Sequence, residues 1–296
     1  MQRKLFEDSQ EKEDEGRRDS RNLLNELTGK DWIQSTNTIW FQRGLGKDHP
    51  ATHYERQHPA PFAYLMIEKL LKFFTKKGGL VLDPFCGVGS TLKAAELNGR
   101  NAVGIELSRQ WIDLSRERLR EEANGGANQK LIQGDSREVM KQFAPDYFDF
   151  IVTSPPYWGI LNKPADHRVN EERVKQNLAT RYSTDTRDLA NITDYQEFLE
   201  ELERVWRECF RTLKPNKYMA IVVADFRHKS KYVMFHSDIA ESMEGAGFSP
   251  KGIIIYVKNA KKLYPYGYPF EFVPNIHHEY IMVFKKGNGN GASNSG

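Results

Sequence analysis

The residues best suited to chemistry follow an apolar run. The run 148–152 has the composition of a buried strand, and it leads into Ser154, Pro155, Pro156 and Tyr157. Consecutive prolines lack N–H groups and fix the backbone, so this loop should be rigid, with carbonyl oxygens left without ladder partners. These carbonyls, the hydroxyl and the ring suit a flat base with an exocyclic amine, because oxygens accept from the amine while the ring stacks on the base. The plain alternative is a strand that ends in a proline-rich turn.

Three carboxylates stand at the ends of three earlier apolar runs. Asp83 and Glu106 end the first two runs, and Asp135 follows the third. An acidic side chain at the end of the second strand of such a unit meets the ribose hydroxyls of a nucleotide, and Asp135 could accept from an adenine amine. Carboxylates at three successive strand ends are hard to explain as core, so they predict a site for an adenosine-type ligand.

The segment from Asp83 to Thr91 reads as a strand, a glycine-containing loop and the start of a helix. Gly87 and Gly89 would let the backbone approach a ligand closely, and the helix start would offer free N–H groups. The loop lacks the third glycine of the G-x-G-x-x-G pattern, which argues against a pyrophosphate cradle.

Elements alternate along the chain in a way that predicts an α/β fold. Apolar runs predict seven strands, at 80–83, 102–106, 130–133, 148–152, 217–224, 252–257 and 279–284. Helical spacing between them, strongest over 195–213, predicts helices on both faces of a mostly parallel, doubly wound sheet. Right-handed crossovers would bring the carboxyl ends of the strands to one edge, where ligands bind.

The domain organisation follows from composition. Residues 1–30 are dense in charge and should form a disordered arm, 31–286 a single domain, and 287–296 a flexible glycine- and asparagine-rich tail. The net charge of +3 fits a nucleic-acid partner without requiring one. Two cysteines and no Cys-x-x-Cys indicate no metal site. The charged N-terminus and short apolar runs indicate an intracellular protein without a signal peptide or membrane span.

Several of these motifs together are similar to those of a known family. His58 to Phe62, then Asp83-Pro84-Phe85-x-Gly-x-Gly, then Gly104-Ile105-Glu106, and finally Ser-Pro-Pro-Tyr resemble the amino-methylating DNA methyltransferases. The resemblance implies the class I fold of methyltransferases that depend on S-adenosylmethionine, with double-stranded DNA as substrate and, in some members, a cognate restriction endonuclease as partner.

The resemblance also assigns residues. It implies catalytic roles for Ser154, Pro155, Pro156 and Tyr157. It places Glu106 at the ribose of S-adenosylmethionine, Asp135 near the adenine and the first motif over the cofactor. The implied cofactor-binding residues are Pro61, Phe62, Asp83, Pro84, Phe85, Gly87, Gly89, Ser90, Thr91, Glu106, Leu107, Asp135 and Ser136.

The tetrapeptide also bears on which base accepts the methyl group. In the resembled family, serine at the first position of the tetrapeptide is commoner in enzymes that modify cytosine N4, and aspartate in those that modify adenine N6. Ser154 therefore favours cytosine, with adenine as the alternative. Cys86 lies in the glycine loop and not beside the base, which argues against carbon-5 methylation. In this chain the predicted cofactor-binding segment precedes the Ser-Pro-Pro-Tyr loop, whereas many enzymes that resemble it in this tetrapeptide have the reverse order.

Basic and aromatic residues outside the core motifs are candidates for DNA contact. The long stretch 159–193 is a candidate target-recognition insertion, and 227–232 and 258–268 follow later strands. Interleaved cations and rings suit phosphates and unstacked bases, although a solvated surface has the same composition. The candidates are Trp158, Arg168, Arg181, Arg227, Lys229, Lys261, Lys262, Tyr264 and Tyr266.

Two other functions remain open from the sequence. An RNA amine methyltransferase would use the same core chemistry, although the residues before the core are too few and too charged for the RNA-binding domain that such enzymes usually carry. A catalytically silent subunit would bind cofactor or DNA only. The presence of Asp83, Glu106 and the Ser-Pro-Pro-Tyr tetrapeptide argues against a subunit without catalytic activity.

Overall fold

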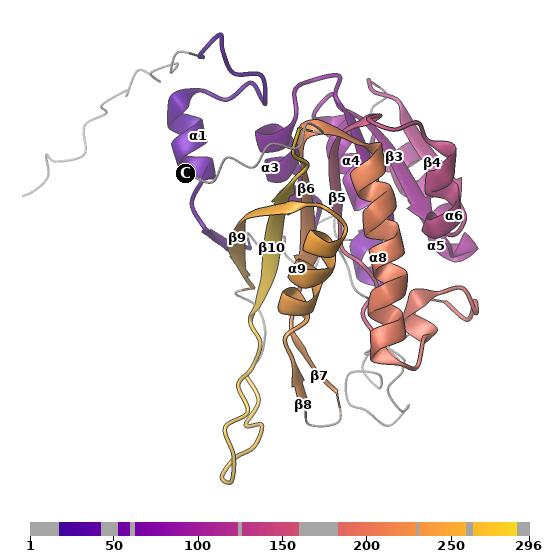
Figure 1. Ribbon diagram of the computed structural model, residues 1–296, viewed down its shortest axis with the longest axis vertical. Helices are drawn as coiled ribbons and strands as arrows, with labels where there is room; N and C mark the ends of the chain where they lie inside the picture. Colours follow the sequence, from indigo (N-terminus) through magenta and orange to yellow (C-terminus); the bar gives the residue numbers. More distant parts are fainter. Residues whose placement is uncertain are drawn as a thin grey trace, which may run out of the picture.

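A central sheet organises the protein (Figure 1). The computed structural model describes residues 18–42, 53–59, 63–123, 126–159, 183–228, 231–258 and 263–288. The sheet has eight strands in the order β1-β9-β10-β6-β5-β2-β3-β4. These are β1 (Ile39–Phe41), β2 (Leu80–Asp83), β3 (Asn101–Glu106), β4 (Gln129–Gln133), β5 (Phe148–Thr153), β6 (Leu213–Val223), β9 (Ser249–Val257) and β10 (His278–Lys285). A separate hairpin joins β7 (Phe226–His228) and β8 (Lys231–Val233).

The sheet is mostly parallel, as predicted. Parallel pairing joins β4, β3, β2, β5 and β6 in one continuous series, and β10 is antiparallel to both β6 and β9. The structure adds β1 to the seven predicted strands. β1 is three residues long and buries Trp40 alone, so it is too short to show a strand pattern in the sequence.

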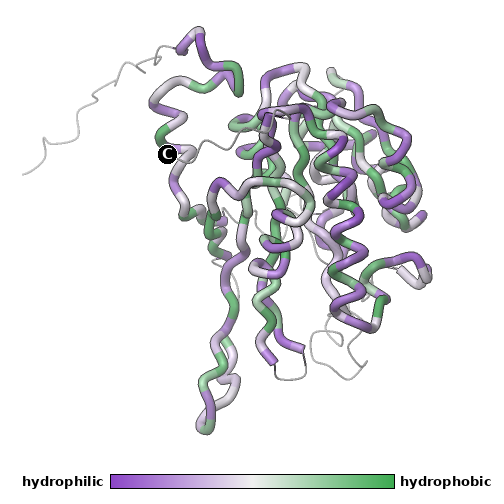
Figure 2. Tube along the Cα trace, viewed as in Figure 1, coloured by the Kyte–Doolittle hydropathy of each residue, from purple (hydrophilic) through white to green (hydrophobic). Residues whose placement is uncertain are grey.

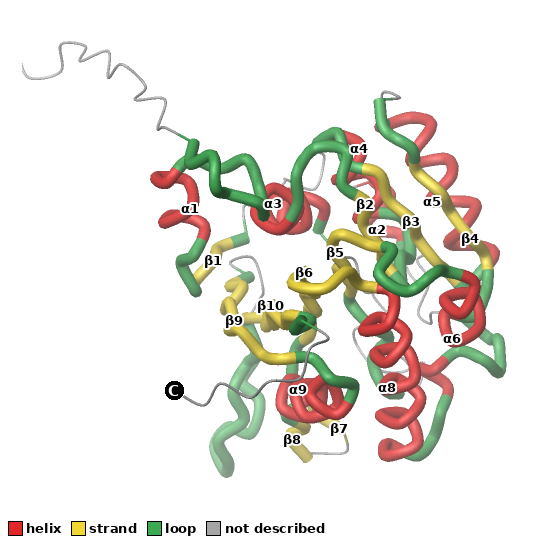
Figure 3. Tube along the Cα trace, turned by 45° about the horizontal axis from the view of Figure 1, so that its top comes forward, coloured by secondary structure: helices red, strands yellow, loops and turns green. Residues whose placement is uncertain are grey.

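Helices cover both faces of the sheet, and Figure 3 shows the two layers on either side of the strands. One face carries α6 (Ser136–Val139), α8 (Tyr195–Thr212) and α9 (Phe235–Gly245). The other carries α3 (Tyr64–Phe74), α4 (Ser90–Leu97) and α5 (Arg109–Glu122). The remaining helices are α1 (Gly29–Ser35), α2 (His53–Gln57) and the short 3-10 turns η2 (Met140–Gln142) and η3 (Leu189–Asn191).

Alternation along the strands builds two cores, one on each face. Leu82 and Ile151 point into the cluster beneath α8 and α9, whereas their neighbours Val81 and Val152 point into the cluster beneath α3 and α4. Successive side chains of a strand face opposite sides, so a strand covered on both faces is apolar throughout. Figure 2 shows these hydrophobic strands inside and hydrophilic stretches along the outer helices.

The helix α8 confirms the strongest helical prediction. Asp194 caps it by accepting from the Glu197 N–H at 2.9 Å, and its apolar stripe, which includes Phe198, Leu202 and Trp206, is fully buried. A side-chain oxygen at this position satisfies one of the N–H groups that a helix start leaves open. The stripe fixes α8 against the sheet beside the ends of β2 and β5.

The chain changes direction across the sheet at β2. From β2 it proceeds to β3 and β4 on one side, and from β5 to β6 on the other, so β2 lies between β3 and β5. In open α/β sheets, ligands bind outside the carboxyl ends of the strands at such a switch point. Asp83 ends β2 and Ser154 directly follows β5, the two strands that meet there.

Some predictions fall on residues outside the described ranges. They are most of the arm 1–30, most of the insertion 159–193, most of the tail 287–296, and Pro61, Phe62, Arg168, Arg181, Lys229, Lys261 and Lys262. The division into arm, single domain and tail stays a prediction.

Candidate active site

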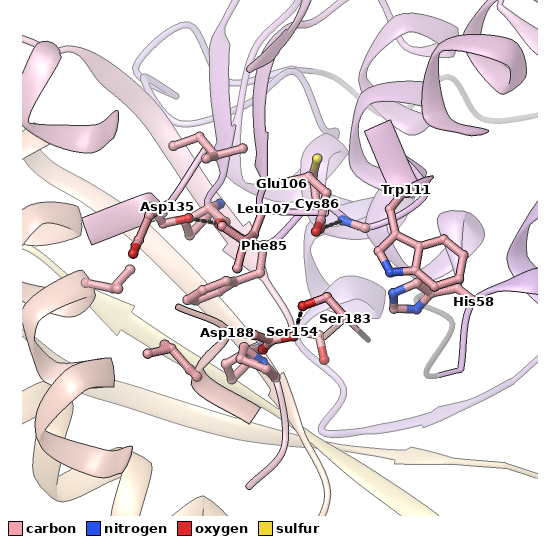
Figure 4. A pocket seen from close by; sticks show the side chains of 18 of the residues that line it. His58, Phe85, Cys86, Glu106, Leu107, Trp111, Asp135, Ser154, Ser183 and Asp188 are labelled. Atoms are coloured by element: carbon pink, nitrogen blue, oxygen red, sulfur yellow. Dashed lines mark hydrogen bonds between the residues drawn. The ribbon is translucent and has the colours of Figure 1, made fainter. Parts of the chain in front are cut away.

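A cavity opens at the carboxyl ends of β2, β3 and β5 (Figure 4). It brings together most of the described residues that the sequence singled out. Those that line it are Pro84, Phe85, Gly87, Ser90, Glu106, Leu107, Asp135, Ser136, Ser154, Pro155 and Pro156. Residues from the predicted cofactor half and from the predicted catalytic loop therefore share one cavity.

Glu106 reaches into this cavity from the end of β3. Its carboxylate accepts from the Gly87 N–H at 3.0 Å and from the Ser108 N–H at 2.8 Å. Burial raises the pKa of Glu106 to about 7, the two N–H donors lower it less, and the nearby charge of Asp188 raises it further. Each carboxylate oxygen has a second lone pair, so Glu106 can still accept from ligand hydroxyls.

The side chain of Asp83 binds neighbouring groups of the protein. It is 1% exposed, and its side chain does not line the cavity. It accepts from Thr91 Oγ1, from Thr153 Oγ1 at 2.7 Å and from the Phe85 N–H at 3.1 Å. Burial raises the pKa of Asp83 to about 6, although these three donors oppose the rise. Asp83 thus ties the start of α4 and the end of β5 to the end of β2 and holds the first residues of the glycine loop, while a direct contact with cofactor stays a prediction.

Asp135 and Ser136 form the wall beyond β4. Asp135 caps α6 by accepting from the Arg137 N–H at 2.9 Å, and it also pairs with the Arg137 guanidinium at 2.6 Å. Ser136 Oγ donates to the Pro84 carbonyl, which ties this wall to the glycine loop. Arg137 also binds Glu201 of α8, so the guanidinium that pairs with Asp135 is itself held in place.

The glycine loop is packed too closely for side chains. Gly87 has a φ of +49°, and a Cβ there would stand 3.3 Å from His58 Nε2. In β3, a Cβ on Gly104 would stand 2.6 Å from Leu92 Cδ1 and 2.9 Å from Cys86 Cβ. The cavity floor therefore depends on the absence of side chains at two points.

Gly104→Ala is expected to lower the free energy of unfolding by roughly 2 kcal/mol, because overpacking in a well-packed core costs about 1–3 kcal/mol. Cys86 and Leu92 would have to move, and the cofactor loop with them. Denaturant unfolding measures the change. Gly126→Ala is the matched control, since nothing lies within 4 Å of that position. Equal stability of the two variants would contradict this account of the loop.

The tetrapeptide predicted to be catalytic divides between the cavity and the core. Ser154, Pro155 and Pro156 line the cavity. The Tyr157 ring does not line it and packs 5.7 Å from the Phe235 ring, while its hydroxyl accepts from the Ala224 N–H at 2.8 Å. Tyr157 therefore braces the loop against β6 and α9 in this conformation. Stacking of its ring on a base stays a prediction.

The cavity also includes His58, which begins the motif predicted to close over the cofactor, and three residues that the sequence did not single out as a site. His58 and Trp111 lie edge to face at 4.8 Å on one side. Ser183 and Asp188 lie on the other, where Ser183 Oγ donates to the Asp188 carboxylate at 2.7 Å. Trp111 has ordinary helical spacing in α5, so the sequence carries no signal that it lines a site. Asp188 comes from the stretch predicted to recognise DNA, and no spacing in the sequence links it to Glu106.

The described candidates for DNA contact lie outside the cavity. Trp158 packs 4.4 Å from the His228 ring and 4.9 Å from the Tyr195 ring. Arg227 donates to the Pro274 carbonyl at 3.1 Å, and Tyr264 and Tyr266 lie in the segment before β10. The cavity and these residues share the edge where the parallel strands end.

Within the described ranges, no group of three or more histidine, cysteine, aspartate or glutamate side chains is arranged to hold a metal ion. The helices among these same residues are all too short or too polar to cross a membrane.

Comparison with known protein families shows which family this chain matches. The DNA methylase family matches residues 2–117 and 148–294. The chain belongs to the DNA methylase family. Residues 82–156, which include the glycine loop and Ser154 to Pro156, also match a methyltransferase domain. These matches confirm the predicted amino-methylating family, the class I methyltransferase fold, and S-adenosylmethionine as the cofactor that this family uses.

Individual relatives of this DNA methylase cover parts of it. The Type II methyltransferase M.BglI of Bacillus subtilis is 35% identical over 95 residues, which are 32% of this chain and 26% of the relative. A tRNA (guanine(10)-N2)-dimethyltransferase of Methanothermobacter thermautotrophicus is 32% identical over 120 residues, 38% of this chain and 34% of the relative. The chain thus spans about a quarter to a third of these relatives' length. The structure of TrmN from Thermus thermophilus, at 13% identity, covers 80% of this chain and 53% of its own with a TM-score of 0.50, which supports the fold alone.

Proposed function

We propose that this protein transfers a methyl group from S-adenosylmethionine to the exocyclic amine of a base in double-stranded DNA, with cytosine N4 as the favoured acceptor. The observation that carries the proposal is the shared cavity, in which the Ser-Pro-Pro loop after β5 faces Glu106 and the glycine loop. Family membership supports the same reaction class.

The cavity has the features that S-adenosylmethionine requires. Glu106 suits the ribose hydroxyls, and Asp135 suits the adenine amine. Phe85, Leu107 and Trp111 supply apolar surface for the flat base of the nucleoside. A Cβ at Gly87 would crowd His58 at the cavity wall, so glycine keeps the loop close to this side chain. When bound, the cofactor supplies an electrophilic methyl group, so the reaction needs no covalent intermediate on the protein.

The catalytic loop would prepare the acceptor. An exocyclic amine is a poor nucleophile because its lone pair is delocalised into the ring. Ser154 Oγ and the Pro155 carbonyl would accept its N–H bonds and favour a more tetrahedral nitrogen. Asp83 contributes through Thr153, because its bond to that side chain holds the end of β5 directly before Ser154. The base must leave the duplex to reach this loop, at a cost of a few kcal/mol.

The identity of the acceptor rests on Ser154, and adenine N6 is the second candidate. An RNA amine is a third, favoured by the similarity to the tRNA methyltransferase. A cognate restriction endonuclease stays a prediction that the Type II relative makes reasonable.

One experiment separates these functions. Unmethylated duplex DNA and transfer RNA are incubated with the protein and labelled S-adenosylmethionine, digested to nucleosides and analysed by mass. We expect N4-methylcytosine from the DNA. N6-methyladenine from the DNA would show that adenine, and not cytosine, accepts the methyl group. Label in RNA alone would show that RNA, and not DNA, is the substrate. Cofactor binding without any transfer would indicate a catalytically silent subunit.

A further inference from the structure

An aromatic segment projects from the edge of the sheet that holds the cavity. It comprises residues 263–277, between β9 and β10, and is called the aromatic finger below. Since β9 and β6 are both antiparallel to β10, their carboxyl ends lie at the same edge. Figure 1 shows the finger in yellow, extending away from the body beside β7 and β8.

The finger exposes large apolar side chains. Phe270 is 93% exposed, Phe272 89% and Tyr268 81%. Contiguous exposed apolar side chains on a protein surface mark interaction sites. Figure 2 shows hydrophobic stretches along the projecting tube.

The finger is an ordered turn and not a loose strand. Asn275 closes its base, since its side chain accepts from the Tyr264 N–H at 3.0 Å and donates to the Tyr264 carbonyl at 2.8 Å. At the tip, the Gly267 carbonyl accepts from the Phe270 and Glu271 N–H groups at 2.7 and 2.8 Å. Gly267 has a φ of +74°, and a Cβ there would stand 2.3 Å from the Glu271 carbonyl. The exposed rings are therefore presented by a defined backbone.

A chain of contacts links the finger to the catalytic loop. Trp158, directly after the tetrapeptide, packs against His228 of β7 at 4.4 Å. The neighbouring Arg227 donates to the Pro274 carbonyl of the finger and lies 5.2 Å from the Tyr232 ring. The finger is thus positioned relative to the loop that would receive the base.

We propose that the aromatic finger contacts duplex DNA through Tyr268, Phe270 and Phe272, which pack against or between bases beside the extruded one. This inference rests on the proposed function, which requires a base to leave the stack. Apolar wedges between base steps occur in proteins that deform DNA, and rings stack on bases of any sequence. The finger contains neither lysine nor arginine, so its contribution is stacking and not phosphate neutralisation.

The test compares Phe270→Ala/Phe272→Ala with the unaltered protein. Affinity for unmethylated, mixed-sequence duplex DNA is measured over a range of salt concentrations. We expect it to fall about tenfold or more, with the slope of log affinity against log salt unchanged, because stacking releases no counterions. Both rings are almost fully exposed, so their removal leaves the core intact. Gly267→Ala keeps the rings but disturbs the turn, and it should weaken binding too.

The controls make the outcomes distinct. Ile33→Ala removes another exposed apolar side chain, on α1, which Figure 1 shows far from the finger, and it should leave duplex affinity unchanged. Affinity for S-adenosylmethionine should be unchanged in all variants. Wild-type duplex affinity in the double variant overturns the inference, as does a shallower salt slope, or a loss of self-association without a loss of DNA affinity. If the unaltered protein methylates DNA, such results overturn the finger alone, whereas an unaltered protein that binds no duplex overturns the proposed function with it.

Discussion

Ser154→Ala is expected to lower the rate of methyl transfer by about 10²-fold, the scale of losing one aligned polar contact in a transition state. Ser154 lines the cavity beside Pro155 and directly follows Thr153, which Asp83 holds. Its hydroxyl is placed to accept from the amine as the nitrogen becomes tetrahedral, so kcat should fall while affinity for S-adenosylmethionine stays within about twofold of the unaltered protein. Single-turnover transfer of labelled methyl to duplex DNA measures the effect.

Ser183→Ala is the matched control for this prediction. Ser183 is a second serine that lines the cavity, but its hydroxyl is bound to Asp188. A smaller loss is expected there, since no reacting atom is assigned to it. Near wild-type methyl incorporation by Ser154→Ala would remove the assigned role, and equal losses in the two variants would point to a general disturbance of the cavity.

Glu106→Ala is expected to weaken S-adenosylmethionine binding by about 10²-fold. The substitution removes the charged acceptor for the ribose and leaves the Gly87 and Ser108 N–H groups without it. A hydrogen bond to a charged group contributes about 1.5–3 kcal/mol, which supports an effect of this size. Calorimetric titration with S-adenosylmethionine measures it. Glu138→Gln, an exposed carboxylate on α6, is the control and should bind normally.

The same carboxyl predicts a pH dependence. Burial raises the pKa of Glu106 to about 7, so the cavity without ligand holds it partly protonated at neutral pH. A carboxylate accepts from both ribose hydroxyls better than a carboxylic acid does, so affinity should rise as the pH rises through about 7 and then level off. Glu106→Gln should bind weakly with no such rise. A rise of equal size in Glu106→Gln would assign the titration to another group.

Folding stability depends on pH in the opposite direction from ligand affinity. Because the folded-state pKa of Glu106 lies above its ordinary value, the folded protein without ligand binds more protons than the unfolded chain between about pH 4.5 and 7. The stabilisation by this group is therefore complete below that window and is lost as the pH rises through 7. Asp83, with a pKa of about 6, acts in the same direction. Bound ligand that donates to Glu106 should reduce the loss.

Asp83 and Tyr157 both show where sequence reasoning stops. Both stand in motifs with a clear family resemblance, and both were predicted to touch a ligand. The structure directs the Asp83 carboxylate to Thr91 and Thr153, and the Tyr157 ring to Phe235. A motif specifies residue types and their order, whereas the direction of a side chain depends on partners that lie far away along the chain.

The sequence by itself determined seven strands in their order along the chain, the carboxylates at three strand ends and the Ser-Pro-Pro-Tyr loop, because apolar runs, glycines and prolines act on the local backbone. Only the tertiary structure decided that Trp111 and Asp188 share a cavity with His58 and Glu106, and that an ordered aromatic finger stands at the same edge. Those outcomes arise from packing between segments distant in sequence, and no local spacing encodes them.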